Sequence, residues 1–188
     1  MLFRSSQTGC DAFKSKQVQI RIPDAVISLA NDTGCAPLSA NFIGSNSQDG
    51  NQYKWYFGDA LSGANDSSAV SNPIHLYNRP GNYTATLTIT DIHGCTNSET
   101  YPIRVNGPTA GFTGGPFTGC PPLMVNFTDT SDFFGSNIVQ WDWNFGNGNT
   151  SSSTTTGSAM TTYQTAGNYS VTLTVTDANG CSQSTTST

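Results

Sequence analysis

The sequence predicts an all-β protein made of two tandem β-sandwiches, and three observations support this prediction. In residues 81–95, apolar side chains fall on every second position with Thr between them, which is the period of a strand with one buried face. The same pattern recurs in residues 167–181. Equivalent residues of the two copies lie 85 to 88 positions apart, and a unit of that length has the size of a small β-sandwich.

The first repeat, residues 23–106, contains several segments with the pattern of strands, and Pro23 stands at the entry of the first. The predicted strands are residues 25–30, 38–42, 53–57, 73–77, 81–90 and 96–105. Period-2 alternation places one set of apolar side chains on the buried face: Leu38, Ala40, Phe42, Tyr53, Trp55 and Phe57. The stretch 61–71 is expected to be a loop.

The second repeat, residues 107–188, follows the same order, so the same core is encoded twice. Its matching apolar residues are Phe112, Leu123, Val125, Phe127, Trp141, Trp143 and Phe145. We expect the last strand of this unit to be incomplete. The junction is short and contains Gly107-Pro108, which predicts sandwiches placed end to end with limited swing.

Residues 1–22 have the pattern of the tail of a preceding repeat. Gly9-Cys10 corresponds to Gly94-Cys95, and the segment Val18–Ile22 corresponds to Ile103–Val105. The chain is therefore expected to be a slice of a longer array. The alternative is that the amino-terminal strand completes a neighbour's open sandwich by strand addition.

The five cysteines occupy repeated positions. Cys35 and Cys120 each precede a strand, while Cys95 and Cys181 each follow an Asp-x-x-Gly hairpin, at separations of 60 and 61 residues. This spacing predicts Cys35–Cys95 and Cys120–Cys181 disulfides, and hence an oxidising compartment. Buried thiols without a bond are the alternative. Cys10 is then left without a partner in this segment.

Composition argues against two kinds of partner. The formal net charge is −5 and only 10% of residues are charged, so there is no basic field for phosphates and no nucleic-acid partner is expected. No apolar run reaches the length of about 18 residues that a membrane-spanning helix needs, so no membrane span is expected in this segment.

Three motifs of the first repeat resemble the PKD (polycystic kidney disease) domain family. They are Trp-x-Phe-Gly-Asp at 55–59, Pro-x-His-x-Tyr at 73–77 and Gly-x-Tyr-x-x-x-Leu-x-Ile-x-Asp at 81–91. The second repeat departs from them with Asn147 in place of Asp and Thr161 in place of His. The resemblance implies two tandem immunoglobulin-like (PKD) β-sandwiches in an extracellular or cell-surface protein. A Gly-Cys after the hairpin resembles tandem arrays of secreted proteins of the Bacteroidetes type.

The sequence offers no catalytic constellation. His75 and His93 have no counterpart in the second repeat and no nucleophile motif is present, so the chain is predicted not to be an enzyme. Asp59 and Asp91 are candidates for Ca²⁺, but Asn147 replaces one of them in the second repeat, and turn capping is the favoured interpretation. No metal and no cofactor are expected. His75 is interpreted as a hydrogen-bonded strand residue.

Exposed aromatic residues are the remaining candidates for contact. Tyr56 lies on the outer face of its strand, and Phe133-Phe134 form an apolar pair in a predicted loop, although packing under that loop is the alternative. We predict a non-catalytic structural segment, a semi-rigid stalk or fibre-forming and adhesin-like module, with neighbouring repeats or other copies as partners. The alternative is a ligand-binding accessory module of a secreted hydrolase that contacts polysaccharide or protein.

Overall fold

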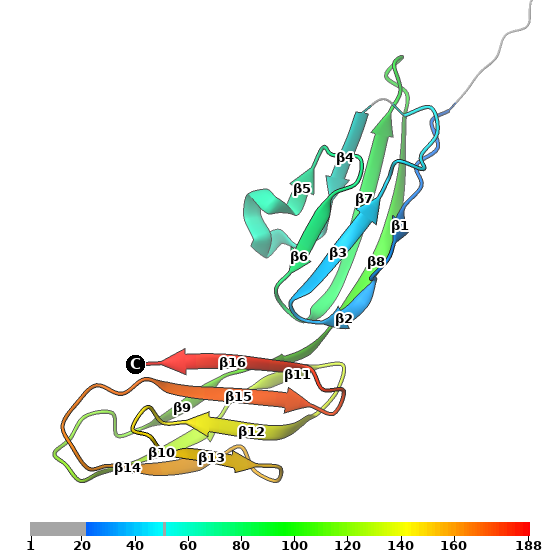
Figure 1. The fold of residues 1–188 in the computed structure, drawn as a ribbon. Helices are drawn as coiled ribbons and strands as arrows, with labels where there is room; N and C mark the ends of the chain where they lie inside the picture. Colours follow the sequence, from blue (N-terminus) through cyan, green and yellow to red (C-terminus); the bar gives the residue numbers. More distant parts are fainter. Residues whose placement is uncertain (1–21, 51) are drawn as a thin grey trace, which may run out of the picture.

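Two β-sandwiches follow each other along the chain in the computed structural model, which describes residues 22–50 and 52–188 (Figure 1). The prediction of an all-β, immunoglobulin-like architecture in two tandem domains is confirmed. Cys10 and nearly all of the predicted tail at 1–22 lie outside the described residues.

The first sandwich packs a three-stranded sheet against a larger one. The first sheet has the order β1 (Ser28–Leu29), β3 (Leu38–Ile43) and β6 (Ile74–Tyr77). The second has the order β8 (Thr96–Thr109), β7 (Gly81–Thr90), β4 (Gln52–Tyr56) and β5 (Ser67–Ser68), with β2 (Thr33–Cys35) pairing in parallel with β8. The predicted loop 61–71 contains β5 and most of a short 3-10 segment, η1 (Ala60–Asp66).

The second sandwich repeats the order of the strands in both sheets, but none of its described strands corresponds to β2. One sheet has the order β9 (Phe112–Gly115), β10 (Leu123–Asp129) and β14 (Ala159–Tyr163). The other has the order β13 (Thr150–Ser153), β12 (Ile138–Asn144), β15 (Val171–Asp177) and β16 (Ser182–Ser187). One further strand, β11 (Asp132–Phe134), pairs with the end of β8 and lies where a loop was predicted.

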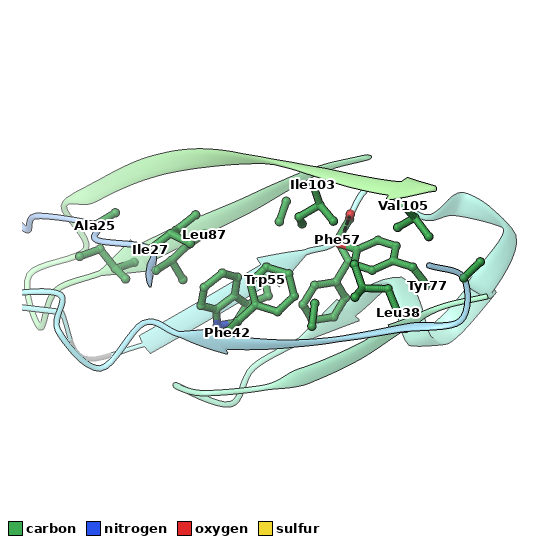
Figure 2. Close-up of a cluster of buried hydrophobic side chains, with 14 residues drawn as sticks. Ala25, Ile27, Leu38, Phe42, Trp55, Phe57, Tyr77, Leu87, Ile103 and Val105 are labelled. Carbon is green, nitrogen blue, oxygen red and sulfur yellow. Dashed lines mark hydrogen bonds between the residues drawn. The ribbon is translucent and has the colours of Figure 1, made fainter. Parts of the chain in front are cut away.

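Both cores follow the alternation that the sequence predicts. In the first, Trp55 and Phe57 are fully buried and their rings contact Phe42 between the two sheets (Figure 2). The second core repeats these positions with Phe127, Trp143 and Phe145. Each large aromatic side chain removes about 150 to 250 Å² from water, so these rings are major contributors to the core of so small a sandwich.

Candidate functional site

A single strand belongs to both domains. The first ten residues of β8 pair with β7, and its last three, Gly107–Thr109, pair with β11 of the second domain. Arg104 and Val105 also pair with β2, and so does Asn106, which lies between the two groups. Figure 1 shows the strand leaving one sandwich and entering the other. Because the backbone of the Gly107-Pro108 junction lies within a strand, it is held by hydrogen bonds on both sides of the domain boundary.

The domains are also joined covalently beside this strand. A disulfide links Cys35 in β2 to Cys181 in the hairpin before β16, with Cα atoms 5.3 Å apart. Next to it, the side-chain amide of Gln183 donates a hydrogen bond of 3.1 Å to the carbonyl oxygen of Ala36. The hairpin of the second domain is thereby fixed on the end of the first.

The predicted pairing of the cysteines within each repeat is wrong. Cys35 pairs with Asn106 near the Gly81 end of β7, whereas Cys95 lies beyond the Thr90 end. Ten strand residues separate these ends, which is about 30 Å and far more than the 7 Å that a disulfide spans between Cα atoms. The bond joins neighbouring repeats instead. Cys95 and Cys120 are exposed and free.

The two hairpins are built alike but differ in exposure. Asp177 Oδ1 accepts hydrogen bonds from the N–H groups of Asn179 and Cys181, at 2.9 and 2.8 Å. Asp91 Oδ1 accepts the equivalent hydrogen bonds from the N–H groups of His93 and Cys95, both at 2.8 Å. Desolvation opposes ionisation of Asp91, but these backbone N–H groups hold its pKa below the usual value. The domain junction leaves Asp177 and Cys181 buried, whereas Cys95 is exposed.

The two candidate calcium ligands do not come together. Asp59 follows the Tyr56 end of β4, and Asp91 follows the strand end that pairs with Gln52, so they occupy opposite ends of the sandwich. Within the described ranges 22–50 and 52–188, no three His, Cys, Asp or Glu side chains are grouped as metal ligands. Turn capping accounts for the hydrogen bonds of Asp91.

His75 and Asp59 form a buried pair in the first domain. Nε2 of His75 lies 3.3 Å from Oδ2 of Asp59, and the imidazole stacks on the ring of Phe57 at 4.3 Å. In the second domain the same place holds Asn147 and Thr161, whose side chains are 3.3 Å apart in a hydrogen bond. A neutral pair thus replaces an ionisable one at the same site. The polar contact serves the packing of the sandwich in both domains.

This pair predicts unequal effects for two substitutions. We expect Asp59→Ala to lower the free energy of unfolding of the first domain by about 1 to 3 kcal/mol, because it leaves buried His75 without its acceptor. Asp59→Asn keeps an acceptor oxygen, as Asn147 does, so its loss should stay below about 1 kcal/mol. Urea unfolding followed by the fluorescence of Trp55 measures both. Equal losses would contradict this role for the carboxylate.

Tyrosine hydroxyls fix the corners of both sandwiches. Tyr83 donates to the carbonyl oxygen of Arg79 at 2.8 Å, and Tyr169 donates to that of Thr165 at 2.9 Å. Such a bond four residues upstream is the tyrosine corner of immunoglobulin-like sandwiches. The corner explains why Gly-x-Tyr opens the repeated strand in each copy.

The three predicted contact residues lie in two different places. Tyr56 is half exposed on β4, and a hydrogen bond to Asp66 raises its pKa. Phe133 and Phe134 lie in β11 at the domain junction. The guanidinium of Arg104 sits over the Phe134 ring at 5.5 Å, so this ring contacts the first domain, while 54% of Phe133 is exposed.

Comparison with known proteins identifies the family. A family model described as PKD domain matches residues 21–106 and again residues 105–188. The chain belongs to the PKD domain family. PKD domains are generally non-catalytic modules. Over the described residues, no helix of this PKD pair is long and apolar enough to cross a membrane.

Solved structures that are similar to this chain include two single PKD domains and a carbohydrate-binding module. The PKD1 domain of Vibrio anguillarum Epp is 34% identical, with 44% of this chain and 90% of that one covered and a TM-score of 0.37. The PKD1 domain of the Vibrio cholerae metalloprotease PrtV is 39% identical, with 43% and 90% covered and a TM-score of 0.36. A carbohydrate-binding module of the β-sandwich superfamily is 17% identical over 90% and 85%, with a TM-score of 0.40.

Sequence reasoning missed the residues that join the two PKD domains. Gln183 and Ala36 carry no motif, and Arg104 was noted only as part of a strand. One signal was available: only Asn106-Gly107-Pro108 interrupts the strand pattern between Val105 and the second repeat, and so short an interruption is compatible with one long strand.

Proposed function

We propose that this PKD pair is a non-catalytic, semi-rigid spacer of an exported protein, which holds a neighbouring part of that protein at a fixed distance and orientation. The observation that carries the proposal is the double connection at the junction, where the β8 strand and the Cys35–Cys181 disulfide both cross from one domain to the other. Two independent connections restrict bending and twisting more than a single linker does.

An extracellular or cell-surface location fits this role. Structural disulfides persist in oxidising compartments, and the Cys35–Cys181 bond joins two domains that also contact each other through Gln183 and Ala36. The surface of the pair carries few charges and many hydroxyl and amide groups, which suits a module that keeps other parts of a protein apart.

Small-angle scattering tests the spacer. We expect the Cys95→Ser/Cys120→Ser protein to scatter as an elongated particle with the end-to-end arrangement of Figure 1. The control adds a short Gly-Ser insertion between Gly107 and Pro108 together with Cys181→Ser, which should broaden the distribution of sizes. A compact particle with the domains side by side would contradict a spacer.

Ligand binding is the second candidate, and exposed Phe133 favours it. More than half of this ring is exposed beside the domain boundary, and an exposed aromatic surface is typical of contact sites. Retention of the protein on insoluble polysaccharides and on matrix proteins tests this candidate. Two variants, Phe133→Ala and Tyr56→Ala, each remove one exposed aromatic ring and show whether that ring is needed for retention. A protein that no matrix retains would remove the support for this function.

A further inference from the structure

The second domain has an open groove at its side, between the edge strands of its two sheets. β13 is the edge of one sheet and β14 is the edge of the other. The volume of the groove is about 490 Å³, within the range of about 300 to 1,000 Å³ that is usual for ligand sites. The residues at its mouth are Asn149, Thr150, Ser151, Met160, Thr162 and Gln164.

A short turn leaves this groove open. In each domain one backbone hydrogen bond closes the turn after the Trp-x-Phe strand: the N–H of Phe57 donates to the carbonyl oxygen of Asp66, and that of Phe145 donates to Asn149. The first turn contains η1, which Figure 1 shows as a coil beside β5. The second turn has only residues 146–148 in the same place. The second domain therefore lacks the segment that stands here in the first.

The polar side chains at the groove have unused hydrogen-bonding capacity. On the outer face of the larger sheet, hydroxyl groups bond to each other across strands, as Thr174 does with Ser184 at 2.7 Å. The side chains at the groove that form no hydrogen bond with any other described residue are Thr150, Ser151, Thr162 and Gln164. Each hydroxyl can donate one bond and accept two, and the amide of Gln164 can both donate and accept.

The groove carries no charge. Residues 107–188 contain no Lys, Arg, His or Glu. Their acidic residues are Asp129, Asp132, Asp142 and Asp177, and none of these lines the groove. An anionic ligand would find no cationic partner here, and a cationic ligand would find no carboxylate. The absence of charge favours a neutral ligand.

Met160 adds an apolar surface to this polar set. Its side chain is 63% exposed, whereas Phe145 and Thr161, which also line the groove, are buried. The flexible thioether side chain of methionine adapts to irregular apolar surfaces. One apolar surface beside unpaired hydroxyl and amide groups suits a molecule with C–H groups on one face and hydroxyl groups around its rim, which describes a sugar ring.

We propose that this groove binds a neutral saccharide. The C–H face of a sugar ring packs on Met160, and its hydroxyl groups exchange hydrogen bonds with Ser151, Thr162 and Gln164. Because the groove is open, most of the ligand stays in water, so the dissociation constant is on the order of 1 mM. This inference rests on ligand binding, the second candidate function above, and assigns it to a surface other than Phe133.

An extended polypeptide is the competing occupant, because both bordering strands have a free edge. Strand addition takes its specificity from pockets that receive every second side chain of the added peptide. Of the described residues that line the groove, only Met160 offers an exposed large apolar side chain. The hydroxyl and amide groups therefore favour the saccharide.

A nuclear magnetic resonance titration of the whole chain tests the site. Cellohexaose, xylohexaose and mannohexaose are the neutral probes, and an oligogalacturonate of the same length is the anionic one. We expect at least one neutral probe to shift the amide signals of residues 149–151 and 160–164, and the anionic probe to shift none of them. The first domain is the internal comparison, and its residues 66–68 and 74–78 should not shift because η1 stands in the equivalent place.

Two substitutions test the hydrogen bonds to the ligand. Thr162→Ala/Gln164→Ala should weaken the binding of the neutral probe about tenfold, because the ligand loses two bonded partners. Thr174→Ala is the matched control, since it removes a hydroxyl from the outer face of the other sheet and should change the affinity by less than about twofold. Equal affinities for both variants would refute these contacts.

A graft tests the groove as a space. Gly148 is replaced by the sequence of residues 60–65, which places the 3-10 segment of the first domain between Asn147 and Asn149. The grafted chain should no longer bind the probe, while urea unfolding followed by the fluorescence of Trp143 shows that the second domain is still folded. A folded graft that binds as tightly as the unaltered chain would overturn the proposal.

The remaining outcomes separate this site from the functions proposed above. Shifts around Phe133 instead of the groove would keep ligand binding and remove this site. Shifts caused by a neutral Gly-Ser peptide, and by none of the saccharides, would overturn the saccharide in favour of a polypeptide. If no probe shifts the groove, the site is refuted, and scattering still decides on the spacer by itself.

Discussion

Loss of the Cys35–Cys181 disulfide lowers the free energy of unfolding by about 4 to 5 kcal/mol, which is the largest effect that we expect from any change in this chain. The bond closes a loop with a sequence separation of 146 residues. In the chain-entropy model, a loop of this length restricts the unfolded chain by about 5 kcal/mol. Urea unfolding of oxidised and reduced protein measures the difference, and the tryptophans of the two domains report on each domain.

A double-mutant cycle separates the bond from the side chains. Cys35→Ser, Cys181→Ser and the double variant should lose the same amount, because each removes the same single bond. Cys95→Ser/Cys120→Ser is the matched control and should unfold as the unaltered protein does, since both thiols are exposed and free. Additive losses from the two single variants would be incompatible with this bond.

The second large effect concerns Gly146 of the Trp-x-Phe-Gly motif. Its φ is +73°, and a Cβ atom there would lie 2.5 Å from the carbonyl oxygen and 3.0 Å from the amide nitrogen of Ser170. The left-handed conformation costs about 1 to 2 kcal/mol for a residue with a side chain. The backbone of Ser170 must also move, so we expect Gly146→Ala to lower the stability of the second domain by at least about 3 kcal/mol.

Gly148 provides the matched control in the same loop. Its φ is +89°, but a Cβ atom would meet nothing within 4 Å. Gly148→Ala therefore carries the conformational cost alone, about 1 to 2 kcal/mol. The fluorescence of Trp143 during urea unfolding compares the two variants. A loss from Gly146→Ala no greater than that from Gly148→Ala would show that the close approach of Ser170 is unimportant.

Most of the fold was predictable because it depends on local periodicity. Alternation along a strand determines which face is buried, and it placed Trp55, Phe57, Trp143 and Phe145 in the cores, as observed. The 3-10 segment Ala60–Asp66 was missed because its Ser, Gly, Asn and Asp residues have the composition of a loop.

The domain junction was less predictable, because it depends on which strand ends of the two domains meet, and these ends are far apart in the sequence. The nearly equal cysteine separations of 60 and 61 residues fit a bond within a repeat and a bond shifted by one repeat equally well. Only the antiparallel course of β7 and β8 shows that Cys35 and Cys95 lie at opposite ends of one sandwich. Likewise, the sequence around Phe134 resembles a loop, and only the structure shows that its ring packs under the guanidinium of Arg104.

The position of the disulfide also determines how the chain responds to mechanical tension. A pulling force that enters before Cys35 and leaves after Cys181 passes through the sulfur–sulfur bond and bypasses the residues between them. A sequence separation of 146 residues corresponds to an extended length on the order of 500 Å, all of which stays hidden from the force. While the bond is oxidised, the pair therefore acts as a nearly inextensible element, and reduction converts it into one that lengthens as its strands are pulled apart.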